Sequence, residues 1–268
     1  MSLKNLSVKT KIHKILLDKL KNKKINNIYK DFENSINNSK NFAVAVSGGP
    51  DSLALAFFSK IYSIRNKVSP KFFIVDHKLR KNSSLEATMV KNLLKKFSIS
   101  VEILTWKGKK PLKNIQSIAR EKRYQLLFKN CKKFKINSIL LGHHQDDLIE
   151  NFFIRIFRGS GLRGLSSLDI NFKFGDKNLI RPLLFQKKED LVFVAKNVFG
   201  YYVKDPSNYD DKFQRIKIRK LIKNFKDIGL KKEQIYKSIR NLKDSNTTIT
   251  FHMNENIKKN SFLREKEN

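Results

Sequence analysis

From residue 42 onward, short apolar runs alternate with longer amphipathic segments. The short runs are continuous or β-branched, as in buried strands, whereas apolar residues in the longer segments recur three or four positions apart, as in helices. This pattern predicts strands at 42–46, 71–75, 100–105 and 138–141. It predicts helices at 51–65, 84–97, 114–134 and 146–158. Such an alternation predicts an α/β fold with a doubly wound, parallel, Rossmann-like sheet.

Helical patterns flank this region on both sides. They predict one or two helices within 8–38, one at 187–199 and two within 220–245. We therefore expect three parts: an N-terminal helical extension over 1–40, an α/β domain over 41–215 and a short helical annex over 216–268. The charged tail from about Asn254 is expected to be disordered.

Polar residues gather where three of the predicted strands end. These clusters are Ser47–Ser52, Asp76–Arg80 and Gly142–Glu150. The carboxyl ends of parallel strands lie along one edge of a sheet, and ligands of such sheets bind there. We therefore expect the three clusters to converge at one crevice.

The first cluster reads Ser-Gly-Gly-Pro-Asp-Ser and joins a predicted strand to a predicted helix. Glycines allow a tight turn that a ligand can approach closely. Backbone amides at a helix N-terminus attract anions, so a phosphate is the expected ligand. The Gly-Lys-Ser/Thr ending of a Walker loop is missing. Two glycines alone would suit an ordinary strand–turn–helix corner, but the whole six-residue stretch favours phosphate binding.

The third cluster combines histidines with carboxylates. Asp147 and Glu150 lie three positions apart and therefore on one helix face. Such a pair suits a cationic substrate or a magnesium ion. His143 and His144 could polarise phosphate oxygens or move protons, while Asp146 is expected to cap the helix. The spacing matches no standard zinc motif.

The charge balance is strongly basic. Lys and Arg total 57 against 24 Asp and Glu, a formal net charge of +33. A polyanionic partner such as RNA would explain this excess, and so would a general drift of composition towards Lys. The charge alone is therefore only modest support for nucleic-acid binding.

The single cysteine and the lack of long apolar runs limit which classes of protein this chain can belong to. Cys131 is the sole cysteine, so a disulfide or a cysteine-rich zinc site is excluded. No apolar run approaches transmembrane length and the N-terminus lacks a signal-peptide core, so we expect a cytoplasmic protein without a membrane partner. The oligomeric state is not predicted.

Arginine-bearing stretches are further candidates. Arg120 and Arg123 share a helix face beside Tyr124, which suits either a solvated basic face or a phosphate contact. Residues 159–164 spell GxGxxG, but they follow a predicted helix rather than a strand, which argues against dinucleotide binding. We interpret them as a glycine-arginine loop able to clamp a phosphate-rich substrate. A basic stripe follows at 215–219.

Together these stretches resemble the tRNA(Ile)-lysidine synthetase family of N-type ATP pyrophosphatases. The matching stretches run in the family's order over residues 40–220. They are Ser47–Ser52, Asp76-His77-x-Leu79-Arg80, Ala119-Arg120-x-x-Arg123-Tyr124, Gly142-His143-His144-x-Asp146-Asp147-x-x-Glu150, Arg158-Gly-Ser-Gly-Leu, Arg181-Pro-Leu, and Asp205-x-Ser-Asn208 followed by Arg215 and Arg219.

The resemblance implies a carbon–nitrogen ligase that uses ATP and Mg²⁺. ATP would adenylate the C2 carbonyl oxygen of the wobble cytidine in the CAU anticodon of tRNA(Ile), releasing pyrophosphate. Free lysine would then replace AMP at C2, forming lysidine.

The resemblance also implies residue roles. ATP would be bound by Ser47, Gly48, Gly49, Pro50, Asp51, Ser52, Asp76 and His77. The catalytic group would be Asp51, which also places Mg²⁺, with Arg123, His143 and Arg215. Lysine would be bound by Asp147 and Glu150, and tRNA by Arg158, Arg163 and Arg219.

Two departures from the family pattern stand out. Lys78 occupies a position where the family usually has glycine. Many members also continue into C-terminal domains that grip the tRNA, so recognition here is expected to rest on the anticodon stem, the short annex and bulk electrostatics.

Three alternatives remain. A tRNA thiolase with the same loop commonly needs several cysteines, and only Cys131 is present. An amidotransferase-type synthetase needs a glutamine-hydrolysing domain for which there is no room. A non-catalytic RNA-binding relative need not keep the loop together with Asp147 and Glu150.

Overall fold

The computed structural model describes residues 3–36, 39–108, 111, 113–203, 214–225, 227 and 229–261. The chain divides into two compact units. Unit 1 comprises Met1–Gln145 and Ile170–Pro206, and unit 2 comprises Asp146–Asp169 and Ser207–Asn268.

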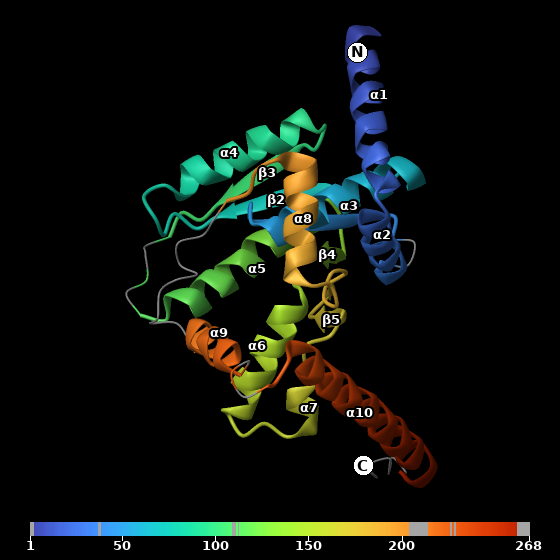
Figure 1. Ribbon diagram of the computed structural model, residues 1–268, viewed down its shortest axis with the longest axis vertical. Helices are drawn as coiled ribbons and strands as arrows, with labels where there is room; N and C mark the ends of the chain where they lie inside the picture. Colours follow the sequence, from blue (N-terminus) through green and yellow to red (C-terminus); the bar gives the residue numbers. More distant parts are fainter. Residues whose placement is uncertain are drawn as a thin grey trace, which may run out of the picture. The chain divides into compact units, whose positions relative to one another are not determined.

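Unit 1 contains the sheet and most helices (Figure 1). Its strands are β1 (Phe42–Val46), β2 (Lys71–Asp76), β3 (Val101–Thr105), β4 (Ser138–Leu140), β5 (Asn171–Phe174) and β6 (Lys177–Ile180). Its helices are α1 (Leu3–Asp18), the 3-10 helix η1 (Lys19–Lys21), α2 (Lys23–Ser35), α3 (Pro50–Asn66), α4 (Ser83–Lys96), α5 (Ile115–Lys133) and α8 (Lys188–Phe199).

The six strands form one sheet in the order β3-β2-β1-β4-β6-β5. All neighbouring strands are parallel except β5, which runs antiparallel to β6. The strand order reverses at β1, which pairs with β2 on one side and β4 on the other. This topology confirms the predicted doubly wound α/β fold, and its ligand-binding switch point lies where β1 and β4 end.

Residues of β1 alternate between two hydrophobic layers, as the two-residue period of a strand requires. Phe42, Val44 and Val46 belong to the layer that includes α3, α4 and α8, whereas Ala43 belongs to the layer that includes Leu127 of α5. Both faces of the sheet are therefore covered by helices (Figure 1). This burial explains why the strands read as continuous apolar runs.

Unit 2 is helical. It contains α6 (Gln145–Ile156, whose first residue belongs to unit 1), α7 (Leu162–Leu165), α9 (Gln214–Asn224) and α10 (Lys232–Asn260). Phe153 of α6 packs on Phe225, just beyond α9, with ring centroids 5.4 Å apart. None of the helices in the described ranges is long and apolar enough to cross a membrane.

Some predicted boundaries change. The β5–β6 hairpin was not predicted, and α10 continues to Asn260, past the point where a disordered tail was expected. The two helices expected within 220–245 are instead α9, which ends at Asn224, and the much longer α10. The Asp205-x-Ser207-Asn208 motif lies outside the described residues.

Candidate active site

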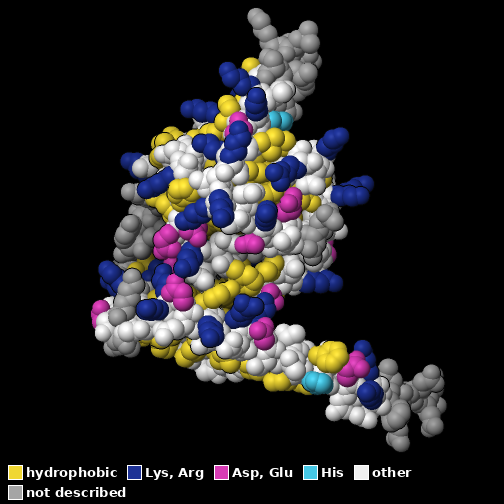
Figure 2. All heavy atoms as spheres, turned by 45° about the vertical axis from the view of Figure 1, so that its right-hand side comes forward, with side chains coloured by type: hydrophobic (Ala, Val, Ile, Leu, Met, Phe, Trp, Pro, Cys, Tyr) yellow, Lys and Arg dark blue, Asp and Glu magenta, His cyan; other side chains and the backbone are white. Residues whose placement is uncertain are grey.

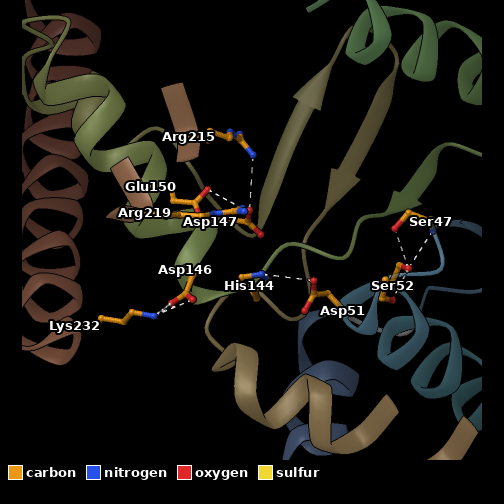
Figure 3. A network of polar contacts seen from close by, with 11 residues as sticks. Ser47, Asp51, Ser52, His144, Asp146, Asp147, Glu150, Arg215, Arg219 and Lys232 are labelled. Atoms are coloured by element: carbon orange, nitrogen blue, oxygen red, sulfur yellow. Dashed lines mark hydrogen bonds and ion pairs between the residues drawn. The ribbon is translucent and has the colours of Figure 1, made fainter. Parts of the chain in front are cut away.

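The Ser47–Ser52 loop lies between β1 and α3, as predicted. Gly49 is the N-cap of α3, and Pro50 occupies the first turn, where its missing N–H costs nothing. The Ser52 hydroxyl accepts hydrogen bonds from the N–H groups of Ser47 and Gly48, both at 3.1 Å, and donates to the Gly49 carbonyl at 3.0 Å. Ser52 therefore holds the loop closed upon the helix N-terminus (Figure 3).

Two glycines allow close packing around this loop. Gly48 has φ +85°, and a Cβ there would lie 2.5 Å from Cγ2 of Val90. A Cβ on Gly142, two residues after the end of β4, would lie 3.1 Å from the backbone N and Cα of Ser52. The chain after β4 therefore approaches the start of α3 closely enough that only glycine fits without a shift.

Gly49 differs from these two glycines. Its φ is −69°, which any residue adopts, and a Cβ there would meet only the Ser47 hydroxyl at 3.7 Å. Nothing within the described chain requires glycine at this position. An anion approaching the amides at the start of α3 would require it, because a side chain would occupy that approach.

His144 contacts the loop. Nε2 of His144 lies 3.6 Å from Oδ2 of Asp51 in the first turn of α3, and the histidine is buried (Figure 3). The first and third polar clusters thus meet, in agreement with the expected crevice. His143 is half-buried and next in the chain to Gly142.

Asp76 fixes the chain that follows β2. Its Oδ1 accepts hydrogen bonds from the Lys78 N–H at 2.9 Å and the Ser83 hydroxyl at 2.8 Å, and its Oδ2 accepts one from Ser84 at 2.6 Å. Burial alone would raise the pKa of Asp76, but the hydrogen bonds outweigh burial and hold that pKa below its usual value. The carboxylate predicted to bind ATP is thus engaged in positioning the turn.

His77 is held in an unusual environment. Both ring nitrogens are buried and make no hydrogen bond within the described residues. Burial, followed by the positive charge of Arg123, lowers the pKa of His77 to about 4. Two predicted site residues from different elements, the β2 end and α5, are therefore close enough to interact electrostatically.

A cavity of about 330 Å³ opens beside His77. It is lined by His77, Lys78, Trp106, Lys107 and Gly108, from the segments that follow β2 and β3. The Trp106 N–H donates to the Asp76 carbonyl at 2.9 Å, which joins the two segments. The cavity combines a flat aromatic ring, an imidazole with buried nitrogens and two lysines, and its volume suits a small ligand.

In unit 2, every carboxylate near the start of α6 faces a cation (Figure 3). Lys232 contacts Asp146 at 2.8 Å, and Nη1 of Arg215 lies 3.8 Å from Oδ1 of Asp147. Asp146 was expected to cap the helix; it lies inside the first turn, one residue after the start of α6, and makes this ion pair. The Asp147–Arg215 pair exceeds hydrogen-bond length and is correspondingly weak.

Glu150 is much more firmly held. Nε of Arg219 donates to its Oε1, and Nη2 donates to its Oε2 at 3.3 Å, while only 2% of the glutamate side chain is exposed. Burial raises the pKa of Glu150 despite the opposing charge of Arg219. Breaking such a buried pair by removing one partner typically costs about 3–5 kcal/mol.

The remaining predicted arginines are exposed. Arg158 follows α6, and Arg163 lies on the short helix α7. Lys and Arg side chains are also spread over the visible face of the molecule in Figure 2, well in excess of acidic ones. This distribution suits a polyanion.

Sequence reasoning missed three features of these sites: the His144–Asp51 contact, the Arg219–Glu150 pair and the Trp106 wall of the cavity. The adjacent histidines of Gly-His-His gave no sign of which one faces the loop. Within the described residues, no group of three or more His, Cys, Asp or Glu could hold a metal ion by itself.

An anion-suited loop at the switch point of a doubly wound sheet, in a unit that also holds a cavity of about 330 Å³, is typical of a nucleotide-binding α/β domain. The chain belongs to the PP-loop domain family, whose model matches residues 17–225.

The chain is similar to curated proteins named tRNA(Ile)-lysidine synthase. The Orientia tsutsugamushi protein is 40% identical over 182 residues, which cover 68% of this chain and 41% of that protein. A Rickettsia bellii protein is 34% identical over 237 residues, which cover 86% of this chain and 52% of that protein. The chain thus spans about half the length of the curated relatives it matches.

Among solved structures, the chain resembles the U34-tRNA thiolase NcsA from Methanococcus maripaludis, described with its [4Fe-4S] cluster. The TM-score is 0.67 at 17% sequence identity, covering 82% of this chain and 80% of that one. This likeness supports the fold.

Proposed function

We propose that this protein ligates lysine to C2 of the wobble cytidine in the CAU anticodon of tRNA(Ile), using ATP and forming lysidine. The observation that carries the proposal is the pairing of two sites in one chain. Unit 1 holds a phosphate-type loop, and unit 2 holds a group of carboxylates on one helix. The similarity to proteins named tRNA(Ile)-lysidine synthase supports the same reading.

The first proposed step is adenylation. The O2 atom of the cytidine attacks the α-phosphorus of ATP, an O–P bond forms, and the bond to the β-phosphate breaks to release pyrophosphate. The pyrophosphate would lie against Gly49 and the amides at the start of α3, with the adenine in the cavity against Trp106 and His77. Arg123 and His143 would stabilise charge that develops on the phosphate.

Magnesium fits this loop as a partner of ATP. Asp51 contributes a carboxylate from the first turn of α3, and carboxylate oxygens are ligands of the kind that Mg²⁺ prefers. When bound, the ion would neutralise phosphate charge. Asp51 would hold it, with His144 orienting that carboxylate from 3.6 Å away.

The second proposed step is aminolysis. The side-chain amine of lysine, after losing a proton, attacks C2; a C–N bond forms, the C2–O2 bond breaks, and AMP leaves carrying O2. Asp147 would receive the lysine ammonium by charge, because it lies in the first turn of α6 three positions from Glu150, on the same helix face. Glu150, fixed by Arg219, would add negative charge behind it, while Arg215 would turn to the leaving AMP.

Arg158 and Arg163, both exposed, would contact the tRNA backbone. Arg219 would reach tRNA only by leaving Glu150, so we assign it first to positioning that carboxylate. Because the proposed substrates are tRNA, ATP and free lysine, the proposal places the protein in the cytoplasm.

The thiolase alternative is disfavoured by Cys131. Its side chain is buried, and burial raises the pKa of the thiol to about 11, which leaves almost no reactive thiolate at neutral pH. Sulfur relay needs such a thiolate.

The nucleotide products test the proposal. With a stem–loop RNA carrying CAU and with free lysine, ATP should be converted to AMP and pyrophosphate. Conversion should fall to background when the anticodon cytidine is replaced by uridine. Release of ADP and phosphate, or conversion of ATP to AMP at the same rate without the RNA, would contradict the proposal.

A further inference from the structure

The β5 strand exposes aromatic side chains at the edge of the sheet. It pairs only with β6, and all four of its residues are exposed. Phe172 and Phe174 alternate with Lys173 and therefore share one face of the strand, where their side chains are 43% and 50% exposed. An exposed aromatic edge strand invites unwanted pairing, so such a surface is typically covered in use.

Helix α5 extends this face. The rings of Tyr124 and Phe174 are stacked, with an interplanar angle of 21° and centroids 6.1 Å apart. The ring centroid of Phe174 also lies 5.6 Å from that of Phe128 and 6.3 Å from that of Phe172. We call these four residues the aromatic face.

Guanidinium groups flank the aromatic face at both ends. Cζ of Arg120 lies 5.4 Å from the Tyr124 ring centroid, and Cζ of Arg181 lies 5.8 Å from that of Phe172. Arg120 is exposed, whereas Arg181 is buried. The face is thus a continuous group of rings with a positive charge at each end, on a chain whose net charge is +33.

This combination favours unpaired nucleic acid over a protein partner. A nucleobase can stack on a phenylalanine ring while its phosphate pairs with a nearby guanidinium. An apolar protein surface would instead have to bury Arg120 without a counter-charge, which is unfavourable. Flat double-stranded surfaces offer no free base to stack.

We propose that the aromatic face binds unpaired RNA nucleotides by stacking, with Phe172 and Phe174 as the stacking residues and Arg120 as a phosphate contact. The proposal rests on the proposed function only for the identity of the RNA, a tRNA anticodon loop. It does not depend on the lysine chemistry.

The test measures binding of the full chain to a stem–loop RNA that carries CAU and a fluorescent purine analogue in its loop. Stacking on a ring should quench the analogue. The double variant Phe172→Ser/Phe174→Ser should lose about tenfold or more in loop affinity and lose the quenching, since base–aromatic stacking contributes about 1–3 kcal/mol per base. Phe172→Trp/Phe174→Trp should retain both.

Two controls separate stacking from general damage. Phe251→Ser replaces a phenylalanine on α10 that is 61% exposed, more than either Phe172 or Phe174, and should leave loop affinity unchanged. Binding of a blunt RNA duplex should be the same for wild type and the double serine variant, because its bases are paired.

Equal loss of loop and duplex binding, or unchanged loop binding and quenching in the double serine variant, would overturn the proposal. Loss of self-association in that variant with unchanged RNA binding would also overturn it, in favour of a protein interface. If the wild-type protein did not bind the stem–loop RNA, the proposed role of the aromatic face would be refuted. The ATP conversion assay would then decide separately whether the proposed function holds.

Discussion

Gly48 and Gly49 are neighbours, but the loop needs them for different reasons. Gly49→Ala should leave the thermal unfolding temperature unchanged, because a Cβ there meets nothing closer than 3.7 Å. The variant should nevertheless lose most ATP affinity, because the methyl group would block the approach of phosphate. Calorimetric ATP titration and thermal unfolding measure the two effects.

Gly48→Ala is the matched comparison. Its Cβ would lie 2.5 Å from Val90, at a φ of +85° that disfavours alanine. This variant should be clearly destabilised even without ATP. Normal ATP affinity in Gly49→Ala would show that phosphate does not bind at this position.

The backbone conformation at Lys78 explains why the related family usually carries glycine at this position. Its φ is +51°, in the left-handed region, which costs a non-glycine residue about 1–2 kcal/mol. Lys78→Gly should therefore raise the free energy of unfolding by up to about 1 kcal/mol, after the entropic cost of glycine is subtracted. Denaturant unfolding gives the value, and Lys81→Gly, outside the left-handed region, should instead destabilise. A loss of stability in Lys78→Gly would argue against this backbone conformation.

His77 predicts a pH dependence of stability. Its folded-state pKa of about 4 lies below the usual 6.5, because of burial and then Arg123. Between these values the unfolded chain takes up a proton that the folded chain does not. The free energy of unfolding is therefore unaffected by His77 above about pH 6.5. Between pH 6.5 and pH 4 it falls as the pH is lowered, by up to about 1.4 kcal/mol per pH unit.

Denaturant unfolding across that pH range, compared with His77→Gln, isolates the contribution. The glutamine variant should show the shallower dependence on pH. Parallel curves for the two proteins would contradict the buried, neutral state of His77.

For single residues, the sequence predicted which side chains belong to the candidate sites better than it predicted which side chains they contact. The phosphate loop follows from six contiguous residues, whose placement between strand and helix is local. Arg219 and Glu150 lie far apart in the chain, so only folding reveals that the guanidinium predicted to touch tRNA binds the carboxylate predicted to touch lysine.

At the scale of elements, helix α6 presents its carboxylates with different degrees of engagement. Asp147→Asn should weaken lysine binding more than ATP binding, because the change removes charge and leaves the α3 loop untouched. Asp146→Asn is the matched control, since Lys232 already occupies that carboxylate at 2.8 Å. Apparent KM values for lysine and ATP measure the effects. Equal losses for both substrates in Asp147→Asn would refute the assigned role.

The predictable elements are those with a strong hydrophobic period. Strands β1 to β4 are buried and read as apolar runs, so their positions were predicted nearly to the residue. The β5–β6 hairpin escaped prediction because β5 is exposed and polar residues interrupt both strands.

At the scale of the whole molecule, fold and function are separate conclusions. The sheet is shared with a tRNA thiolase at 17% identity, so the fold alone does not choose between sulfur transfer and lysine transfer. The choice rests on the α6 carboxylates, the buried thiol of Cys131 and the similarity to curated lysidine synthases. The charge of +33 adds affinity for RNA without specifying which RNA.

The most direct measurement is the chemical identity of the wobble nucleoside after reaction. Purified protein, ATP, isotope-labelled lysine and a tRNA(Ile) transcript with a CAU anticodon are incubated, and the RNA is digested and examined by mass spectrometry. We predict that the wobble cytidine gains the mass of one labelled lysine less one water, and that omission of ATP abolishes the product. An unmodified wobble cytidine, from a protein that binds ATP and the transcript normally, would contradict the account.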